Sequence, residues 1–521
     1  MTTGHHRIAK SAGLIGLAIL CSRILGFVRD VVIAAMFGTG ASAQAFVVAF
    51  RVPNMMRDLV AEGATNAAIV PVFSGYRARG EREEFWRLAW VLAKRSAVVL
   101  LVIVTLGVVA APLVVRCIAP GFAGDPERFG LTVLLTRLLV PYLLLIGLTA
   151  FAVGVLNADE LFAASSWGQS LLNIMVIICA VWLAPQLSEP VVALAIGTLV
   201  GGVLQLGVLV PSLVRRGFRP VPGAGWTHPG VTQIHRLLVP RTVGSGVYQL
   251  SVFIDTVLAS LVWIVGEGGV AALYYANRLI QFPLAIFGVA VAQASLPAMS
   301  AHVVRGEMEE LRQTISFTLR VTVCVMIPAS VGLAVAAEPI VRTLFERGAF
   351  DVYSTDVTTQ ALVFYSIGLS AYAGMKLLTS VFYAMHDTKT PTAVAAGALA
   401  TNLGLNLWLM YPLKVGGLAL ATSISSIGSC VVLFVILQRR LGTLDERRIV
   451  RSLARVVAAA AVMGTGCWLM VRQGMPLAAT VAGGVVLFLV AALALRVEEL
   501  RQAWRMVTRR LVQESAEGRR Q

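Results

Sequence analysis

A succession of long apolar segments, separated by short charged loops, is the feature of this chain that most constrains its fold. An α-helix needs about 20 apolar residues to cross the hydrocarbon layer of a membrane, and such segments follow one another from residue 11 to residue 496. The composition agrees, because 57% of the 521 residues are hydrophobic and 13% are charged, whereas soluble domains carry about 25% charged residues. The sequence therefore predicts an all-α polytopic membrane protein.

The apolar segments, read one by one, predict about 14 transmembrane helices. The expected spans are residues 11–37, 42–73, 88–115, 130–156, 161–184, 190–213, 236–264, 270–299, 312–336, 356–384, 390–411, 415–438, 450–471 and 475–496. Charged residues interrupt the first two of these spans.

The net charge of +16 comes mostly from arginines in alternate loops. Basic loops lie at residues 77–87, 215–219, 305–312 and 439–451, and the loops between them hold few basic residues. This alternation is the positive-inside pattern, and it predicts that both termini are cytoplasmic. The charge is thus explained by topology, and we expect no nucleic-acid partner.

Two proline-bearing segments predict an internal repeat. Residues 50–53 and 71–74 in the second span are similar to residues 281–283 and 297–300 in the eighth, as expected for the paired halves of a transporter. The predicted domains are a six-helix lobe at 1–230, a second at 231–445, two additional helices at 446–498 and a basic cytoplasmic tail at 499–521.

Charged side chains inside the apolar spans are the candidate functional residues. A charge at the centre of a membrane helix costs about 2.5–3.5 kcal/mol on insertion scales, so such residues normally face a hydrated cavity or one another. The candidates are Arg23, Arg29, Asp30, Arg57, Glu62 and Arg278. Because guanidinium groups are always charged and donate two parallel hydrogen bonds, an excess of arginine predicts a cavity that binds phosphate or pyrophosphate.

Each of these charges also has a plainer interpretation. Arg23 could extend from a helix end to the membrane surface, and Arg29 with Asp30 could be a local ion pair. Asp255, in the seventh span, either neutralises an arginine or titrates during transport. Lys376 in the tenth span is a second candidate for coupling, and extension to the surface is its alternative interpretation.

The sequence lacks the motifs of an energy-converting or hydrolytic enzyme. It contains no G-x-x-x-x-G-K-[ST], no G-x-S-x-G and no H-E-x-x-H, and its cysteines form no C-x-x-C pair. We therefore expect no catalysis, no metal and no cofactor. A secondary carrier driven by an ion gradient or by the membrane potential fits best.

Several short segments resemble one known family. Residues 22–30, 53–63 and 274–283, with the loops at 119–122 and 387–391, resemble the MurJ (MviN) lipid II flippases. That family belongs to the multidrug/oligosaccharidyl-lipid/polysaccharide exporter (MOP) superfamily. The resemblance implies two six-helix lobes around a central cavity and two further helices that form a groove for a lipid tail.

The resemblance also implies a function in peptidoglycan biosynthesis, and hence in cell-wall assembly and cell shape. Such a flippase moves lipid II, an undecaprenyl-pyrophosphate-linked disaccharide pentapeptide, from the inner to the outer leaflet of the bacterial cytoplasmic membrane by alternating access. Its expected partners are lipid II, the bilayer and proteins of cell-wall synthesis.

By this resemblance, the family's substrate-binding positions correspond to Arg23, Arg29, Asp30, Arg57, Glu62 and Arg278. Three positions that are acidic in the family carry amides here, at Gln44, Asn277 and Gln281. Asp255 stands where an uncharged residue is common. These departures affect ion coupling and leave the cationic cavity in place.

Other functions fit the same architecture. A flippase for another polyprenyl-linked oligosaccharide would differ only in its substrate. A cation antiporter of the same superfamily would need an acidic cavity, and a membrane enzyme acting on polyprenyl phosphates would need an acid–base pair near the arginines. A non-transporting scaffold for cell-wall assembly would keep working without the arginines.

Overall fold

The computed structural model describes residues 2–58, 65–161 and 167–500. Within these residues every regular element is a helix and no strand occurs, which confirms the predicted fold class. The chain divides into two compact units, which are Met1–Ala271 with Arg347–Asp351, and Ala272–Glu346 with Val352–Gln521.

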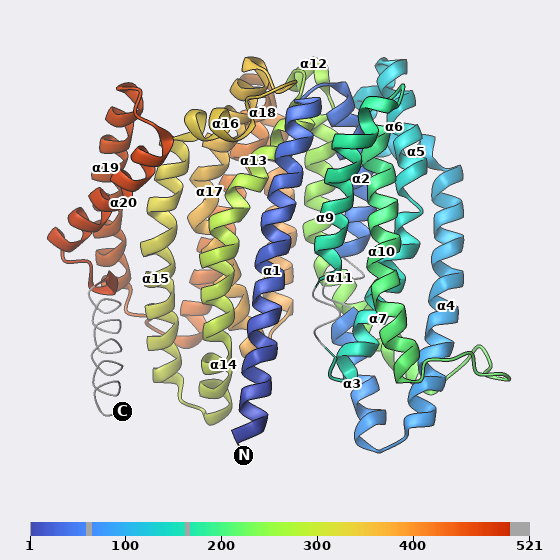
Figure 1. Cartoon of the computed structure of the whole chain (residues 1–521). Helices are drawn as coiled ribbons and strands as arrows, with labels where there is room; N and C mark the ends of the chain where they lie inside the picture. The colour runs from blue at the N-terminus through green and yellow to red at the C-terminus, as the bar shows by residue number, and fades with distance from the viewer. Residues whose placement is uncertain (1, 59–64, 162–166, 501–521) are drawn as a thin grey trace, which may run out of the picture. The chain divides into compact units, whose positions relative to one another are not determined.

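The first unit contains the helices from α1 to α12, drawn from blue to light green in Figure 1. Their bounds are α1 Thr2–Phe37, α2 Ala41–Arg57, α3 Thr65–Ala78, α4 Arg82–Val109, α5 Ala111–Ile118, α6 Pro126–Leu139, α7 Tyr142–Ala158, α9 Gly168–Ile178, α10 Val192–Arg216, α11 Pro229–Ala259 and α12 Val262–Val265. A π-helical turn, η3, extends α9 over Cys179–Leu183. Short 3-10 turns, η2 and η4, occupy Pro120–Gly124 and Ala184–Gln186.

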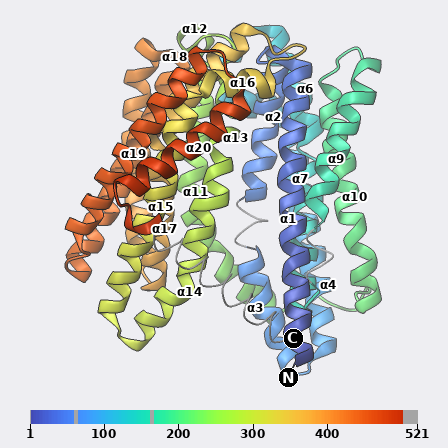
Figure 2. The same cartoon turned by 60° about the vertical axis from the view of Figure 1, so that its left-hand side comes forward.

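The second unit contains the helices from α13 to α20, although the first residues of α13 belong to the first unit. Their bounds are α13 Gly269–Pro283, α14 Ala290–Arg305, α15 Met308–Val335, α16 Ala337–Phe345, α17 Val352–Ala384, α18 Lys389–Leu441, α19 Glu446–Arg472 and α20 Leu477–Ala494. A π-helical segment, η5, joins α13 to α14 over Leu284–Val289. Helices α19 and α20 lie side by side in both views (Figures 1 and 2).

Every span expected from the sequence coincides with one or more of these helices. In the described part of the chain, 10 helical segments are long and apolar enough to cross a membrane. The α18 segment combines two expected spans across a kink at Lys414, where φ is 49° and ψ is −126°. The expected span at 130–156 is divided between α6 and α7 next to Pro141, which cannot donate the backbone hydrogen bond that would continue a helix.

Small residues let the helices of the first unit approach closely. A Cβ atom added to Gly201 would lie 2.8 Å from the Cα of Leu172 in α9, and one added to Gly202 would lie 2.8 Å from the Tyr142 ring in α7. The adjacent glycines therefore bring α10 into contact with two neighbours at once. Small residues allow this close approach of helix backbones in membrane proteins.

In the second unit, Asp387 fastens the turn before α18. Its carboxylate accepts hydrogen bonds from the backbone N–H groups of Lys389 at 2.9 Å and Thr390 at 3.0 Å. The Thr390 hydroxyl donates to it at 2.6 Å, and the Arg440 guanidinium near the other end of α18 also contacts it. The Thr390 hydrogen bonds, followed by the one from Arg440, hold the pKa of Asp387 well below its usual range.

Replacing Asp387 with alanine is expected to lower the free energy of unfolding by about 1–2 kcal/mol, the usual cost of losing a carboxylate at a helix start. Because the pKa of Asp387 is lower in the folded protein than in the unfolded chain, this stabilisation is present at neutral pH. It is lost only as the pH falls below about 4, the ordinary pKa of an aspartate. Thermal unfolding of the purified protein in detergent at several pH values measures it. The exposed Asp356→Ala variant is the control, and an equal loss in both variants would contradict the assignment.

Candidate functional site

Arg29 of α1 lies in a buried hydrogen-bond network that includes Asp30 and Asn173. Its Nε and Nη2 donate to Asp30 Oδ1 at 3.1 and 2.7 Å, and its Nη1 donates to Asn173 Oδ1 at 3.1 Å. Arg29 and Asp30 are only 7% and 1% exposed. Asn173 in α9 also donates to the carbonyl of Ser22 at 3.1 Å, so it joins two turns of α1 to α9.

Asn173 packs directly against α1 at Gly26, which lies one turn before Asp30. A Cβ atom added to Gly26 would meet the Asn173 side chain at 3.5 Å, an ordinary van der Waals distance, so this contact does not require a glycine. The sequence analysis did not include Asn173 among the candidate residues. Its position as an amide within the apolar part of α9 could have indicated a polar contact there.

A second arginine–aspartate pair lies at the end of α2. Arg57 Nε and Nη2 donate to Asp58 Oδ1 at 3.3 and 3.1 Å, and Gln249 of α11 donates to Asp58 Oδ2 at 3.2 Å. As in the first pair, an aspartate accepts hydrogen bonds from the adjacent arginine. The amide from another helix contacts the aspartate here, whereas in the first pair it contacts the arginine. Gln249 was not expected from the sequence either. Glu62 lies outside the described residues.

Arg278 lies in α13 of the second unit against an aromatic side chain of its own helix. Its Nη2 donates to the Tyr274 hydroxyl at 3.2 Å, and its guanidinium carbon is 5.2 Å from the centre of the Tyr274 ring. A ring face attracts a cation, so Tyr274 orients a guanidinium that is neither fully buried nor fully exposed. The spacing of four residues places the two side chains on one face of α13.

Three further candidates are Arg23, Lys376 and Asp255. Arg23 is exposed on α1, and Lys376 is exposed on α17. Asp255 is half-buried on α11. Within the described residues, no group of three or more His, Cys, Asp or Glu side chains is arranged to hold a metal ion.

Arg29, which is buried, and Arg57, which is half-buried, therefore both carry local counter-charges. Taking an ion pair out of water is costly unless its remaining donors and acceptors are satisfied, and Asn173 and Gln249 each supply one such contact. Both guanidinium groups are thus held in fixed orientations by the neighbouring carboxylates. A guanidinium group can donate paired hydrogen bonds to a phosphate.

Comparison with known proteins identifies the family. A family model described as lipid II flippase MurJ matches residues 33–508. The chain belongs to the MurJ lipid II flippase family. Among curated MurJ relatives, the probable lipid II flippase MurJ of Haemophilus influenzae is 34% identical over 474 residues, which cover 87% of this chain and 91% of that protein.

A second MurJ relative matches a similar share of the chain. The lipid II flippase MurJ of Burkholderia cenocepacia is 36% identical over 425 residues, which cover 81% of this chain and 82% of that protein. The matched residues of the family model include Arg57 and Arg278, and they begin after Asp30.

Solved structures show the same fold. A lipid II flippase MurJ in an inward closed conformation superimposes with a TM-score of 0.80 at 24% identity, covering 92% of this chain and 98% of that one. An inward-facing multidrug resistance MATE transporter of the MOP superfamily gives a TM-score of 0.68 at 15% identity, covering 82% and 96%. The chain therefore has the transporter fold of this superfamily and is an integral membrane protein.

Proposed function

We propose that this chain is a lipid II flippase of the bacterial cytoplasmic membrane. It carries the undecaprenyl-pyrophosphate-linked disaccharide pentapeptide from the inner to the outer leaflet during peptidoglycan synthesis. Membership of the MurJ family over most of the chain is the observation that carries this proposal. It acts as a carrier, without catalysis.

The proposed binding groups are the arginines Arg23, Arg29, Arg57 and Arg278 and the acids Asp30 and Glu62. Guanidinium groups suit a pyrophosphate because they donate paired hydrogen bonds to its oxygens and keep their charge at any physiological pH. The aspartates hold the arginines in place before the substrate arrives, and the tail of the substrate stays in the lipid. Alternating access then moves the head group across.

The cycle requires an energy source, for which Asp255 and Lys376 are the proposed coupling residues. A membrane potential that is negative inside favours outward movement of negative charge by about 2.3 kcal/mol per charge per 100 mV. The basic loops between the spans support an orientation with both termini in the cytoplasm. Two six-helix lobes at 1–230 and 231–445 and two further helices at 446–498 complete the proposed organisation.

The test is the leaflet accessibility of lipid II in cells depleted of this protein. We expect the precursor to accumulate in the inner leaflet, and expression of the wild-type chain to restore its exposure outside. Arg278→Ala is expected to fail, whereas Arg447→Ala, which removes an exposed arginine of α19, is expected to restore exposure fully. Normal outer exposure after depletion would reject the proposal and favour another polyprenyl-linked substrate or a scaffold role in cell-wall assembly.

A further inference from the structure

A tryptophan in the loop between α10 and α11 lies against the side of α4. The Trp226 residue is 55% exposed, and the centre of its ring lies 4.7 Å from Lys94 Nζ. Lys94 also donates hydrogen bonds to the carbonyls of Ala224 at 3.0 Å and Gly225 at 3.4 Å. Arg95 donates to the carbonyl of Trp226 at 3.4 Å. Two side chains of α4 thus hold this loop, which projects beside α4 in Figure 1.

The exposed surface of α4 changes from charged to apolar within about one turn of this contact. At the start of the helix the exposed side chains are charged, whereas Val98, Val99 and Val102 are 45%, 55% and 53% exposed. These valines follow Arg95 by three, four and seven residues, so they lie on the same face of α4 as Arg95. Large exposed apolar side chains continue to the last turn of the helix. Lys94 and Arg95 therefore mark the boundary between water and the apolar layer of the membrane.

The position of Trp226 at this boundary fits the chemistry of a membrane surface. Tryptophan is enriched at the level of the lipid headgroups, because most of its ring is apolar while its indole N–H donates a hydrogen bond. Residues 220–227 of the loop carry no charged side chain. A layer of headgroups can therefore cover the loop without burying a charge of the loop itself.

The basic side chains around the loop have no carboxylate to balance them. No Asp or Glu occurs in residues 85–124 or in residues 190–254. Lys94 and Arg95 donate to backbone carbonyls, and in the part of the chain that the structure describes they form no ion pair. The same holds for Arg215 and Arg219, which are exposed at the end of α10 and in the loop. The counter-charges for these groups have to come from outside the chain.

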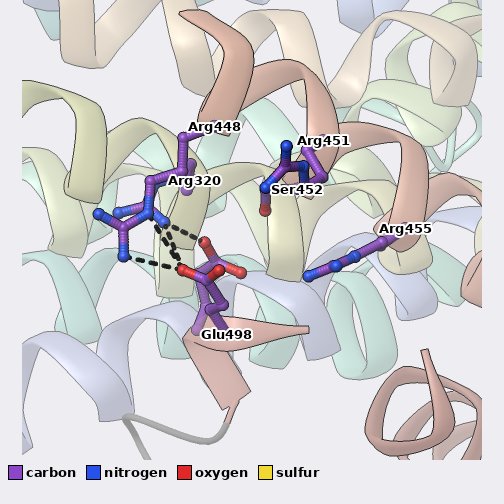
Figure 3. A pocket seen from close by; sticks show the side chains of 7 residues that line it. Arg320, Arg448, Arg451, Ser452, Arg455 and Glu498 are labelled. Atoms are coloured by element: carbon purple, nitrogen blue, oxygen red, sulfur yellow. Dashed lines mark hydrogen bonds and ion pairs between the residues drawn. The ribbon is translucent and has the colours of Figure 1, made fainter. Parts of the chain in front are cut away.

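A comparable cation in the second unit is neutralised by the chain itself. Helices α4 and α15 are both 28 residues long, and Arg320 occupies the position in α15 that Lys94 occupies in α4. Arg320 contacts Glu499 at 2.9 Å and Glu498 at 3.6 Å, and Arg448 contacts Glu498 at 2.8 Å. Figure 3 shows Arg320, Arg448 and Glu498 in this cluster. The cations beside α4 lack such carboxylates, so this surface of the first unit attracts anions.

We propose that residues 219–227, together with Lys94 and Arg95, form a binding surface for the headgroups of anionic phospholipids. The lipids belong to the leaflet that adjoins the basic loops at 77–87 and 215–219. Trp226 lies among the headgroups, and the basic side chains attract the lipid phosphates. A zwitterionic headgroup carries a positive charge of its own, so the surface favours phosphatidylglycerol over phosphatidylcholine.

The test is tryptophan fluorescence of the full-length protein in nanodiscs whose lipids carry bromine on their acyl chains, since bromine quenches a nearby indole ring. The signal of the wild type minus that of Trp226→Phe isolates Trp226 from the other tryptophans of the chain, which has nine in total. We expect brominated phosphatidylglycerol to quench this difference signal at a mole fraction roughly fivefold lower than brominated phosphatidylcholine. A factor of five corresponds to the attraction of about one basic side chain to an anionic surface.

The double variant Lys94→Gln with Arg95→Gln is expected to lose this preference, because glutamine can still donate to the loop carbonyls but carries no charge. Arg116→Gln is the matched control, since it removes an exposed positive charge beyond the opposite end of α4. Equal quenching by both lipids in the wild type would overturn the preference for anionic headgroups. Quenching by iodide in the water, with none by either brominated lipid, would overturn the membrane contact.

Hydrogen–deuterium exchange of residues 219–227 gives a second measurement that needs no variant. We expect slower exchange in nanodiscs of phosphatidylglycerol than in nanodiscs of phosphatidylcholine, and equal exchange in both would contradict the proposal. Neither measurement depends on lipid II transport, so the proposed flippase function is tested separately.

Discussion

Replacing Arg29 with alanine is expected to reduce lipid II transport roughly 100-fold, the largest effect of any single substitution in the first unit. The change leaves Asp30, which is 1% exposed, buried without its guanidinium partner. It also removes the guanidinium N–H that donates to Asn173 Oδ1. Truncating one member of a buried charge pair costs about 2–5 kcal/mol, and about 1.4 kcal/mol corresponds to a factor of ten. Transport of lipid II into proteoliposomes measures the effect.

A double variant separates substrate binding from structural support. In Arg29→Ala with Asp30→Ala, both charges are gone, so thermal stability is expected to recover towards that of the wild type. Transport should stay low, because the guanidinium that would bind the pyrophosphate is still missing. Recovery of both stability and transport would show that Arg29 is only a structural ion pair. The exposed Arg79→Ala variant is the control for loss of one positive charge.

Replacing Arg320 alone is expected to lower the free energy of unfolding by about 3–5 kcal/mol, because Glu499 is then an uncompensated buried charge. Replacing Glu499 alone is expected to cost less, because Arg320 keeps its contact with Glu498 at 3.6 Å. Their side chains are 6% and 3% exposed and 2.9 Å apart. Because this pair joins α15 to the chain after α20, its loss should also loosen the end of the second unit. Thermal unfolding in detergent measures both single variants.

The control for this pair is Arg342→Ala. The Arg342 side chain also forms ion pairs, but it is 54% exposed, so its loss should change the free energy of unfolding little. The combined variant Arg320→Met with Glu499→Leu should be close to the wild type in stability, since well-packed apolar residues replace buried ion pairs at little cost. A combined loss equal to the sum of the two single losses would contradict the ion-pair explanation.

The sequence predicted the helices well because membrane spans depend on local composition. Runs of apolar residues mark their own positions, and every expected span coincides with observed helix. The division at Pro141 and the kink at Lys414 are finer features of the same local kind. The sequence alone does not say which helices pack together. Helical periodicity shows which residues share one face of a helix, but it does not show which other helix packs against that face.

The partners of the charged residues show this limit. Asn173 is 144 residues from Arg29, and Glu499 is 179 residues from Arg320, so no spacing rule connects them. The arginines of α1, α2 and α13 stood out because charge in an apolar span is conspicuous. Arg320 was overlooked within its span, and the expected boundary at residue 498 separated two glutamates that both contact it.

The π-helical segment η5 makes the length of the eighth span functionally important. A π-helical turn accommodates about one residue more than an α-helical turn, and η5 occupies Leu284–Val289 between α13 and α14. Loss of that one residue would restore a continuous α-helix with little change in the direction of Arg278 relative to α14, whereas loss of a second residue would turn Arg278 by about 100° about the axis. The segment is apolar, so its composition leaves room for substitution. Insertions and further deletions within it would redirect the charged side chain of Arg278, so the length of the segment is constrained more strongly than its residues.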